Sequence, residues 1–420
     1  MQIEHFHNAC CIVKSTESTR ILCDPWFNPG AFCGSWALAH PIHRPIPVAF
    51  QDFDLLYISH IHPDHFDQIF LRSIDKSIPI IIPNEQPISI LKKKLEALGF
   101  KKIIPLDNCQ TFQYSDLELT LFTPFLKSRM HADYELPNFL DSALLISDGQ
   151  SSFLNTNDNY PSIDSIKWIE ENYGVPDILS LLYNSAGFYP QSVNNFSVAE
   201  KIAEKHKVVE RCFQMLLETS MASSSKYIMP FAGDYALTGK LWNLNQFLPV
   251  STPKVASNFL EKKGINTLCL GSGGIFCLKS DRYLKQGTHY TIEDAMIHAE
   301  SPKWLYPYEI EKQISTNDLR KKLPLASKKM EEKQHLLNCF PDWEIELISE
   351  DQESIYNIDC SRSTAKNYMQ CVLDKRLLNG ILDRKYHWDN AQIGCHINFT
   401  RSSHPSYSSE LHTLLAFIHL

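Results

Sequence analysis

The sequence predicts an α/β protein in which sheets are covered by helices, followed by a smaller α+β domain. Over the first 235 or so residues, short apolar runs of strand length alternate with segments whose apolar residues recur at helical spacing. This alternation is typical of layered sheets and helices. After Phe231 it gives way to a polar region rich in Pro, Tyr and Lys, and then to a second set of strands and helices. We therefore expect two domains, residues 1–250 and 251–420.

The individual elements follow from local composition. Strands of the first domain are expected in residues 10–15, 20–26, 55–60, 78–83, 143–147, 152–156, 177–183 and 227–231, and helices in residues 87–100, 162–174 and 197–221. The second domain is expected to have helices at 253–264, 365–383 and 408–420 and strands at 342–350 and 391–400. The polar stretch 126–142 predicts a long loop, and a loop of that length in a compact domain is often functional.

Composition excludes several classes of protein. The net charge of -8 is spread along the chain without a basic stripe, so we expect no nucleic-acid partner. The N-terminus does not resemble a signal peptide, and no apolar run is long enough to span a membrane. The 12 cysteines are scattered without a C-x-x-C pair. These features predict a reduced, cytoplasmic protein that does not bind membranes.

A cluster of histidines and aspartates follows the strand expected at residues 55–60. In "YISHIHPDHFDQIF", His60 and His62 leave the strand on the same side, because strand side chains alternate with a period of two. Pro63 suits the first turn of a helix, which would aim Asp64 and His65 back at the same cavity. Two such pairs of ligands predict a site for two metal ions.

Two further motifs are interpreted as structural. His5 and His7 in "HFHNA" have a ligand-like spacing but no carboxylate nearby, so we expect a structural or supporting role. The glycines of "GSGGIF", residues 271–276, are not followed by a Lys-Ser/Thr pair, which favours a tight turn over a phosphate-binding loop.

The pattern H-x-H-x-D-H after an apolar strand resembles the metallo-β-lactamase fold superfamily. That resemblance implies a four-layer αββα sandwich with a dinuclear metal site, and "RILCDPW" places Asp24 after a strand as many members do. More of the chain resembles the CMP-N-acetylneuraminate hydroxylase group. The similar stretches occur in the same order and are "DPWFNPGAFCGSWALAHP", "LLYISHIHPDHFD", "FLNTNDNYP", "SAGFYP", "YIMPFAG" and "HWDNAQIGCHINFTR".

The resemblance implies further metal ligands. His131, upstream of a strand, would complete a three-histidine face with His60 and His62, and Asp158 resembles the bridging carboxylate. A final histidine is missing from "MPFAGDYALTG", where Asp234 is the only nearby side chain that could bind a metal. Mixed histidine and carboxylate ligation suits iron or manganese as well as zinc.

Two chemistries fit such a site. The hydroxylase group consists of iron-dependent monooxygenases that use dioxygen, and its members carry an N-terminal Rieske domain that we do not find in this sequence. We therefore predict a cytoplasmic, non-haem diiron oxygenase of a small polar metabolite, which takes its electrons either from a separate electron-donor protein or from the substrate itself. The alternative is a dinuclear zinc hydrolase of a phosphodiester, lactone or amide.

Substrate-binding residues are expected around the segment "YNSAGFYP", residues 183–190, which resembles a loop over the site. Asp64 is also expected to be the catalytic residue. The candidates for substrate contact are Tyr183, Asn184 and Tyr189 in this loop and Arg129, Arg362 and Arg401 for a substrate anion.

Overall fold

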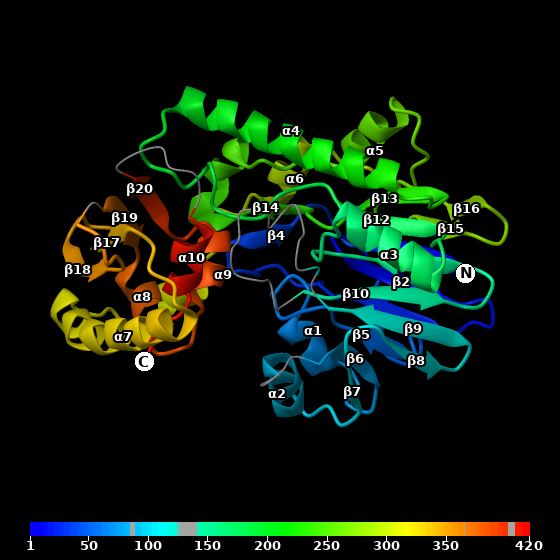
Figure 1. Cartoon of the computed structure of the whole chain (residues 1–420), viewed down its shortest axis with the longest axis horizontal. Coiled ribbons are helices and arrows are strands. Elements are labelled where there is room, and N and C mark those ends of the chain that lie inside the picture. Colours follow the sequence, from blue (N-terminus) through cyan, green and yellow to red (C-terminus); the bar gives the residue numbers. More distant parts are fainter. Residues whose placement is uncertain (85–88, 124, 126–140, 365, 402–407) are drawn as a thin grey trace.

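The computed structural model describes residues 1–84, 89–123, 125, 141–364, 366–401 and 408–420. Two large sheets face each other, helices cover the outer side of each, and a smaller sheet with its own helices stands beside them (Figure 1). The fold class predicted from the sequence, an αββα sandwich with a C-terminal α+β part, is confirmed.

The first sheet has eight strands. Across the sheet their order is β16 (Arg282–Lys285), β15 (Ile275–Cys277), β1 (Gln2–His7), β2 (Cys10–Lys14), β3 (Arg20–Cys23), β5 (Leu55–Tyr57), β6 (Ile80–Pro83) and β7 (Ile103–Leu106). The strands from β3 to β7 run parallel, and the others pair antiparallel. Ile80, Ile81 and Ile82 are fully buried, because a parallel strand under helices has two buried faces.

The second sheet has six strands. Their order is β13 (Tyr227–Phe231), β12 (Ile178–Leu182), β11 (Ser152–Asn155), β10 (Ala143–Ser147), β9 (Leu117–Phe122) and β8 (Gln110–Tyr114). Apolar side chains of both sheets join one buried cluster, which includes Val13 and Ile81 from the first sheet and Leu119, Leu144 and Leu154 from the second. Burial of this apolar surface between the sheets is the main force that holds the sandwich together.

Helices cover the outer faces of both sheets (Figure 1). On the first sheet, α1 (Gln68–Ser73) and α2 (Ile90–Ala97) place Phe70 and Leu95 in a buried cluster with Ile80. The second sheet is covered by α3 (Ile163–Tyr173), α4 (Val198–Ala222) and α5 (Pro253–Glu261). At the start of α4, Ser197 and Glu200 form a capping box that satisfies free backbone amides.

The C-terminal part is built on a four-stranded sheet. Its strand order is β18 (Ser354–Asp359), β17 (Trp343–Ser349), β19 (Asn367–Leu373) and β20 (Asn398–Arg401), and its helices are α7 (Thr316–Leu337), α8 (Lys375–Leu382), α9 (Trp388–Ile393) and α10 (Ser409–Leu415). The helix expected at residues 365–383 was wrong in its first half, because residues 367–373 form β19. Residues 391–400 likewise divide between α9 and β20.

Shorter elements connect the two parts. A two-stranded sheet, β4 (Trp36–Leu38) with β14 (Tyr235–Leu237), lies between them in Figure 1. The rings of Trp36 and Tyr235 stack within it, with centroids 3.4 Å apart. The remaining elements are η2 (Gly239–Phe247), α6 (Ile292–Ala299) and η3 (Pro307–Ile310).

The division of the chain differs from a simple cut at residue 250. Strands β15 and β16 follow that residue in sequence, yet β15 pairs with β1 in the first sheet. In the other direction, Val193 forms a parallel bridge with Phe399 of the C-terminal sheet. We propose that the sandwich extends through β16 and that residues 188–196 connect it to the C-terminal part.

Candidate metal centre

The histidine-rich turn follows β5 at one edge of the sandwich. Pairing with β6 continues to Ile58, whose amide donates to the carbonyl of Ile81 at 3.1 Å. The chain then turns, with the His65 amide donating to the His62 carbonyl at 3.0 Å. Asp67 caps α1 immediately afterwards. The turn is thus fixed at both ends, by a strand and by a capped helix.

The structure brings five of the predicted metal ligands together. His60 Nε2 lies 2.9 Å from His62 Nδ1 and 3.8 Å from Asp158 Oδ2, and these three residues form a group that could hold a metal ion. His65 Nε2 lies 3.4 Å from Asp158 Oδ2 and 3.5 Å from Asp64 Oδ2. The two pairs meet at Asp158, which is the placement expected of a bridging carboxylate.

The chemistry of these groups fits a bound cation. Asp64 Oδ1 and His65 Nε2 are buried and form no hydrogen bond with a described residue. Burial raises the pKa of Asp64 and lowers the pKa of His60 well below its usual value. For His65, burial alone would lower the pKa, but the carboxylates of Asp158, Asp64 and Asp24 raise it well above its usual value. Buried carboxylates with unpaired oxygens need positive charge, which metal ions would supply.

Asp141 is a site residue that the sequence interpretation missed. Its Oδ1 lies 3.6 Å from His60 Nε2, and the residue lies two positions before β10. A ligand before this strand was expected, but the histidine chosen for it, His131, lies outside the described residues. The available signal was the position of Asp141 two residues before a strand. Its carboxylate adds a third acidic group to those of Asp64 and Asp158.

Asp24 orients the cluster through contacts with His65 and with the backbone of Ser59. It is fully buried, with Oδ2 3.2 Å from His65 Nδ1 and Oδ1 accepting the Ser59 amide at 2.7 Å. The Ser59 hydroxyl lies 2.9 Å from His60 Nδ1. These contacts use the ring nitrogens that face away from the cluster, so Nε2 of both histidines is directed at it.

Another carboxylate reaches the cluster from the C-terminal part. Asp389 of α9 places Oδ2 3.3 Å from His62 Nε2. Burial alone would lower the pKa of His62, but the hydrogen bond and the charge of Asp389 raise it to about 9. Asp389 was missed although it lies in the stretch "HWDNAQIGCHINFTR" that resembles the hydroxylase group, because that resemblance did not connect it with the histidine turn.

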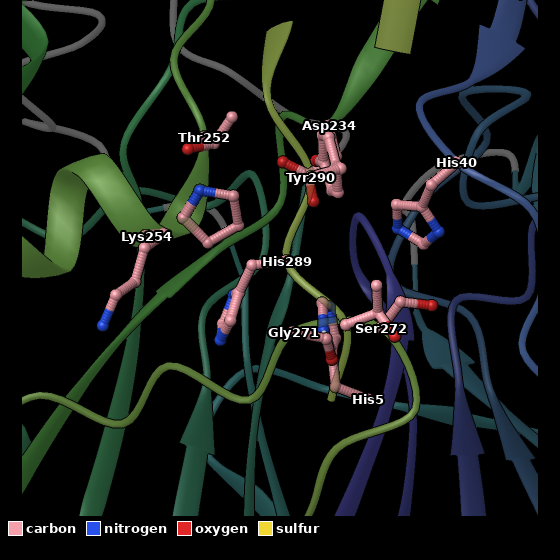
Figure 2. A pocket seen from close by; sticks show the side chains of 11 residues that line it. His5, His40, Asp234, Thr252, Lys254, Gly271, Ser272, His289 and Tyr290 are labelled. Atoms are coloured by element: carbon pink, nitrogen blue, oxygen red, sulfur yellow. The ribbon is translucent and has the colours of Figure 1, made fainter. Parts of the chain in front are cut away.

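Asp234 is not part of this cluster. Its buried carboxylate accepts a hydrogen bond from the Tyr183 hydroxyl and faces Tyr290 and His40 in a separate pocket (Figure 2). The nearest link to the cluster is Asn8, whose Nδ2 donates to Asp64 at 3.1 Å and whose Oδ1 accepts the Asp234 amide at 3.2 Å. We therefore no longer expect Asp234 to bind the metals in this conformation.

His5 and Gly271 line the same pocket (Figure 2). Both ring nitrogens of His5 lie near backbone oxygens, 3.2 Å from the Gly271 carbonyl and 3.1 Å from that of Asn8. Gly271 has φ +63°, and a Cβ there would lie 2.9 Å from the Thr288 carbonyl oxygen. The contacts of His5 and Gly271 agree with a structural role, whereas both ring nitrogens of His7 are buried and form no hydrogen bond with a described residue.

The predicted substrate residues are dispersed. The side-chain amide of Asn184 forms hydrogen bonds with the backbone of Gly233 and Ser251, so we no longer expect this residue to contact substrate. The Tyr189 hydroxyl donates to Glu204 at 2.7 Å. The guanidinium of Arg401 lies 5.8 Å from the ring of Tyr189.

The other arginines do not add to this group. Arg362 is exposed on the C-terminal part and stacks on Phe340 at 3.3 Å, and Arg129 lies outside the described residues. Among the predicted cationic residues, Arg401 is therefore the one with a described position beside the 183–190 segment.

The cluster lies at an edge where two facing sheets contribute ligands. The H-x-H-x-D-H turn follows parallel strand β5 of the first sheet, whereas Asp141 and Asp158 flank β10 and β11 of the second. The chain has the metallo-β-lactamase fold. The described helices include none that is long and apolar enough to cross a membrane.

Sequence comparisons support a partial likeness to the hydroxylase group. No protein-family model matches the chain. A Rieske 2Fe-2S iron-sulfur protein of Mycolicibacterium smegmatis is 29% identical over 238 residues, which are 56% of this chain and 43% of that protein. A cytidine monophosphate-N-acetylneuraminic acid hydroxylase of Danio rerio is 33% identical over 85 residues, 20% of this chain and 14% of the hydroxylase. The matches thus span less than half the length of these relatives.

Solved structures that align with this chain are named for different activities. A "possible metal-dependent hydrolase" of Veillonella parvula aligns with a TM-score of 0.47 and 14% identity, covering 66% of this chain and 99% of that chain. The diiron β-hydroxylase CmlA of Streptomyces venezuelae aligns with a TM-score of 0.44 and 18% identity, covering 68% of this chain and 54% of CmlA. They do not distinguish an oxygenase from a hydrolase.

Proposed function

We propose that the chain is a metal-dependent oxidoreductase, a non-haem diiron oxygenase that hydroxylates a small polar metabolite with dioxygen. The observation that carries this proposal is the acidic composition of the cluster. Three carboxylates, from Asp64, Asp141 and Asp158, accompany the three imidazoles of His60, His62 and His65. The sequence similarity to hydroxylases and to Rieske proteins points in the same direction.

The donor set favours a harder metal than a purely histidine site would. Carboxylate oxygens suit iron and manganese, and imidazole suits iron and zinc, so an equal mixture fits iron well. In this assignment His60, His62 and Asp141 would hold one ion, Asp64 and His65 would hold the other, and Asp158 would be shared between them. Bound iron would supply the ability to bind and reduce dioxygen.

The overall reaction requires a source of electrons. Hydroxylation consumes the substrate, dioxygen, two electrons and two protons, and releases the hydroxylated product and water. Two electrons per turnover require a reductant. We propose that an electron-donor protein supplies them, since relatives named as Rieske iron-sulfur proteins match part of this chain.

The chain's own residues would prepare the site for this reaction. Asp24 and Ser59 hold the imidazoles of His65 and His60 with Nε2 toward the cluster. Tyr189 and Arg401 are proposed to bind the substrate and its anionic group, since the guanidinium lies beside the Tyr189 ring. Asp64, which has one unpartnered oxygen among the described residues, is the proposed group for moving a proton.

The test begins with metal content. Protein expressed in iron-supplemented medium and purified without oxygen is analysed for iron, zinc and manganese, and absorption spectra are recorded before and after air. About two irons per chain with an oxygen-dependent spectrum support the oxygenase. Zinc alone, without an oxygen response, refutes it and favours the dinuclear zinc hydrolase, because zinc activates water at such sites.

A further inference from the structure

The contact between Asp389 and His62 joins two regions far apart in sequence. Asp389 Oδ2 lies 3.3 Å from His62 Nε2, across 327 residues of chain. The other ring nitrogen, His62 Nδ1, faces the cluster, 2.9 Å from His60 Nε2. His62 is therefore held between an acidic partner on one side and the candidate metal site on the other.

The helix that carries Asp389 is well anchored in the C-terminal part. Asp389 lies in the first turn of α9, where the helix N-terminus favours a negative charge. Trp388 and Ala391 of the same helix belong to the buried C-terminal cluster. Gln392 is buried as well, and its Oε1 lies 2.6 Å from His412 Nδ1 of α10. The Asp389 carboxylate is therefore carried by a helix whose position is fixed by buried contacts.

A second contact sets the position of α9 relative to His62. The loop after α9 packs against the N-terminal loop at Phe32, where His396 Nε2 lies 3.0 Å from the Phe32 carbonyl oxygen. At Gly394 the approach is so close that a Cβ would lie 2.5 Å from the same oxygen. The ring of Phe32 in turn lies 5.8 Å from the ring of His62. The C-terminal part is therefore docked directly beside the candidate ligand.

We propose that Asp389 is a positioning residue of the metal centre and that the C-terminal part completes the centre through it. By accepting a hydrogen bond from His62 Nε2–H, Asp389 selects the tautomer in which Nδ1 carries the lone pair. It also fixes the ring plane. Carboxylate partners of this kind raise the basicity of a histidine ligand, and their removal typically lowers metal affinity by about 10–100-fold. The inference rests on the proposed metal site.

A simpler alternative is that Asp389 only links the two parts of the molecule. The side chains of His62 and Asp389 are 18% and 36% exposed, so an ordinary ion pair at this place would contribute little to stability. The two roles differ in a measurable way. A mere link would leave metal affinity unchanged apart from a small change in the stability of the metal-free protein, whereas a positioning residue changes metal affinity beyond any change in stability.

The experiment compares four proteins as full-length chains: wild type, Asp389→Ala, Asp389→Asn and Asp383→Asn. Asp383 is the matched control, because it lies on the same C-terminal part and pairs with Lys322 at 2.7 Å, with 44% of its side chain exposed. Metal-free protein is titrated under argon with Fe²⁺, and in parallel with Zn²⁺, against a competing chelator. Urea unfolding of each metal-free protein is measured separately.

We expect Asp389→Ala to weaken metal binding by 10–100-fold and Asp389→Asn to weaken it less, because an amide oxygen still accepts from His62. Asp383→Asn should retain wild-type affinity. The inference is overturned if both Asp389 variants bind the metals as the wild type does, or if their affinity falls only in proportion to a loss of metal-free stability. If the wild type itself binds neither Fe²⁺ nor Zn²⁺, the proposed metal site falls and the inference falls with it.

Discussion

Replacing Asp24 gives a direct test of how the buried cluster is held. Asp24 is fully buried and joins two elements, through Oδ1 to the Ser59 amide at 2.7 Å and through Oδ2 to His65 Nδ1 at 3.2 Å. Its φ of +42° lies in the left-handed region, which Asn tolerates about as well as Asp. Asp24→Asn therefore removes the charge without added backbone strain, whereas Asp24→Ala removes both contacts.

The expected loss of unfolding free energy follows from the polar groups that lose Asp24 as a partner. In Asp24→Ala, the buried Ser59 amide loses its acceptor at a cost of about 1–3 kcal/mol. Breaking a buried ionic contact to His65 costs about 3–5 kcal/mol when the remaining charge has no other partner. Here Asp64 and Asp158 remain near His65, so the second cost is reduced. We expect a loss of about 3 kcal/mol for Asp24→Ala and about half of that for Asp24→Asn.

Urea unfolding of the metal-free variants, followed by circular dichroism, measures these differences. Chelator competition measures metal affinity, which should fall by about 10–100-fold because the His65 ring is no longer oriented. The control is Asp164→Asn, an exposed carboxylate in the first turn of α3, for which we expect a change within about 0.5 kcal/mol. Wild-type stability and affinity in both Asp24 variants would refute this reasoning.

Four further outcomes are expected. Asp141→Ala should remove about one metal ion per chain, as measured by elemental analysis, and a full complement of two would contradict its role as a ligand. Metal at 100 times its Kd should stabilise the protein by about 2.7 kcal/mol in urea unfolding, and an unchanged midpoint would argue against binding to the folded state. Burial would raise the pKa of Glu4, but His43 and Arg44 lower it to about 2. Ionised Glu4 therefore contributes about 2 kcal/mol to the free energy of unfolding, after allowance for solvent screening. This contribution is present above the unfolded pKa of 4.5 and is lost as the pH falls toward 2. In Glu4→Gln, the free energy of unfolding should therefore depend less on pH between 4.5 and 2. Gly233→Ala should lower the free energy of unfolding, measured in urea, by about 2–3 kcal/mol, because φ at this residue is +88° and the new Cβ would lie 2.8 Å from Asn184 Cβ. Wild-type stability in this variant would show that the loop can move.

The fold could be predicted where local pattern and burial agree. Buried strands such as β6 and β10 are continuous apolar runs, and α4 shows clear helical spacing. Strand β8 was missed because it is a polar edge strand whose residues are largely exposed. The pairing of β15 with β1 joins residues about 270 positions apart, which no local pattern reveals.

The site could be predicted only as far as its spacing is local. His60, His62, Asp64 and His65 lie within six residues, so periodicity alone suggested that they meet. Asp141 and Asp389 are single carboxylates on other elements, and a single carboxylate resembles any surface residue in sequence. Asp234 illustrates the opposite error. Its position in the chain matched that of an expected ligand, but its side chain bonds to Tyr183 instead.

The return of β15 to β1 and the docking of α9 beside His62 also affect when the protein can acquire its metals. During synthesis the histidine turn is made first, since it lies within the first 65 of 420 residues. Strands β15 and β16 of its sheet are complete only at residue 285, and Asp389 follows later still. Domains usually fold as their residues emerge from the ribosome. Here the histidine turn has to wait for residues far downstream, so we expect the metal centre to assemble only after β15, β16 and α9 have been made.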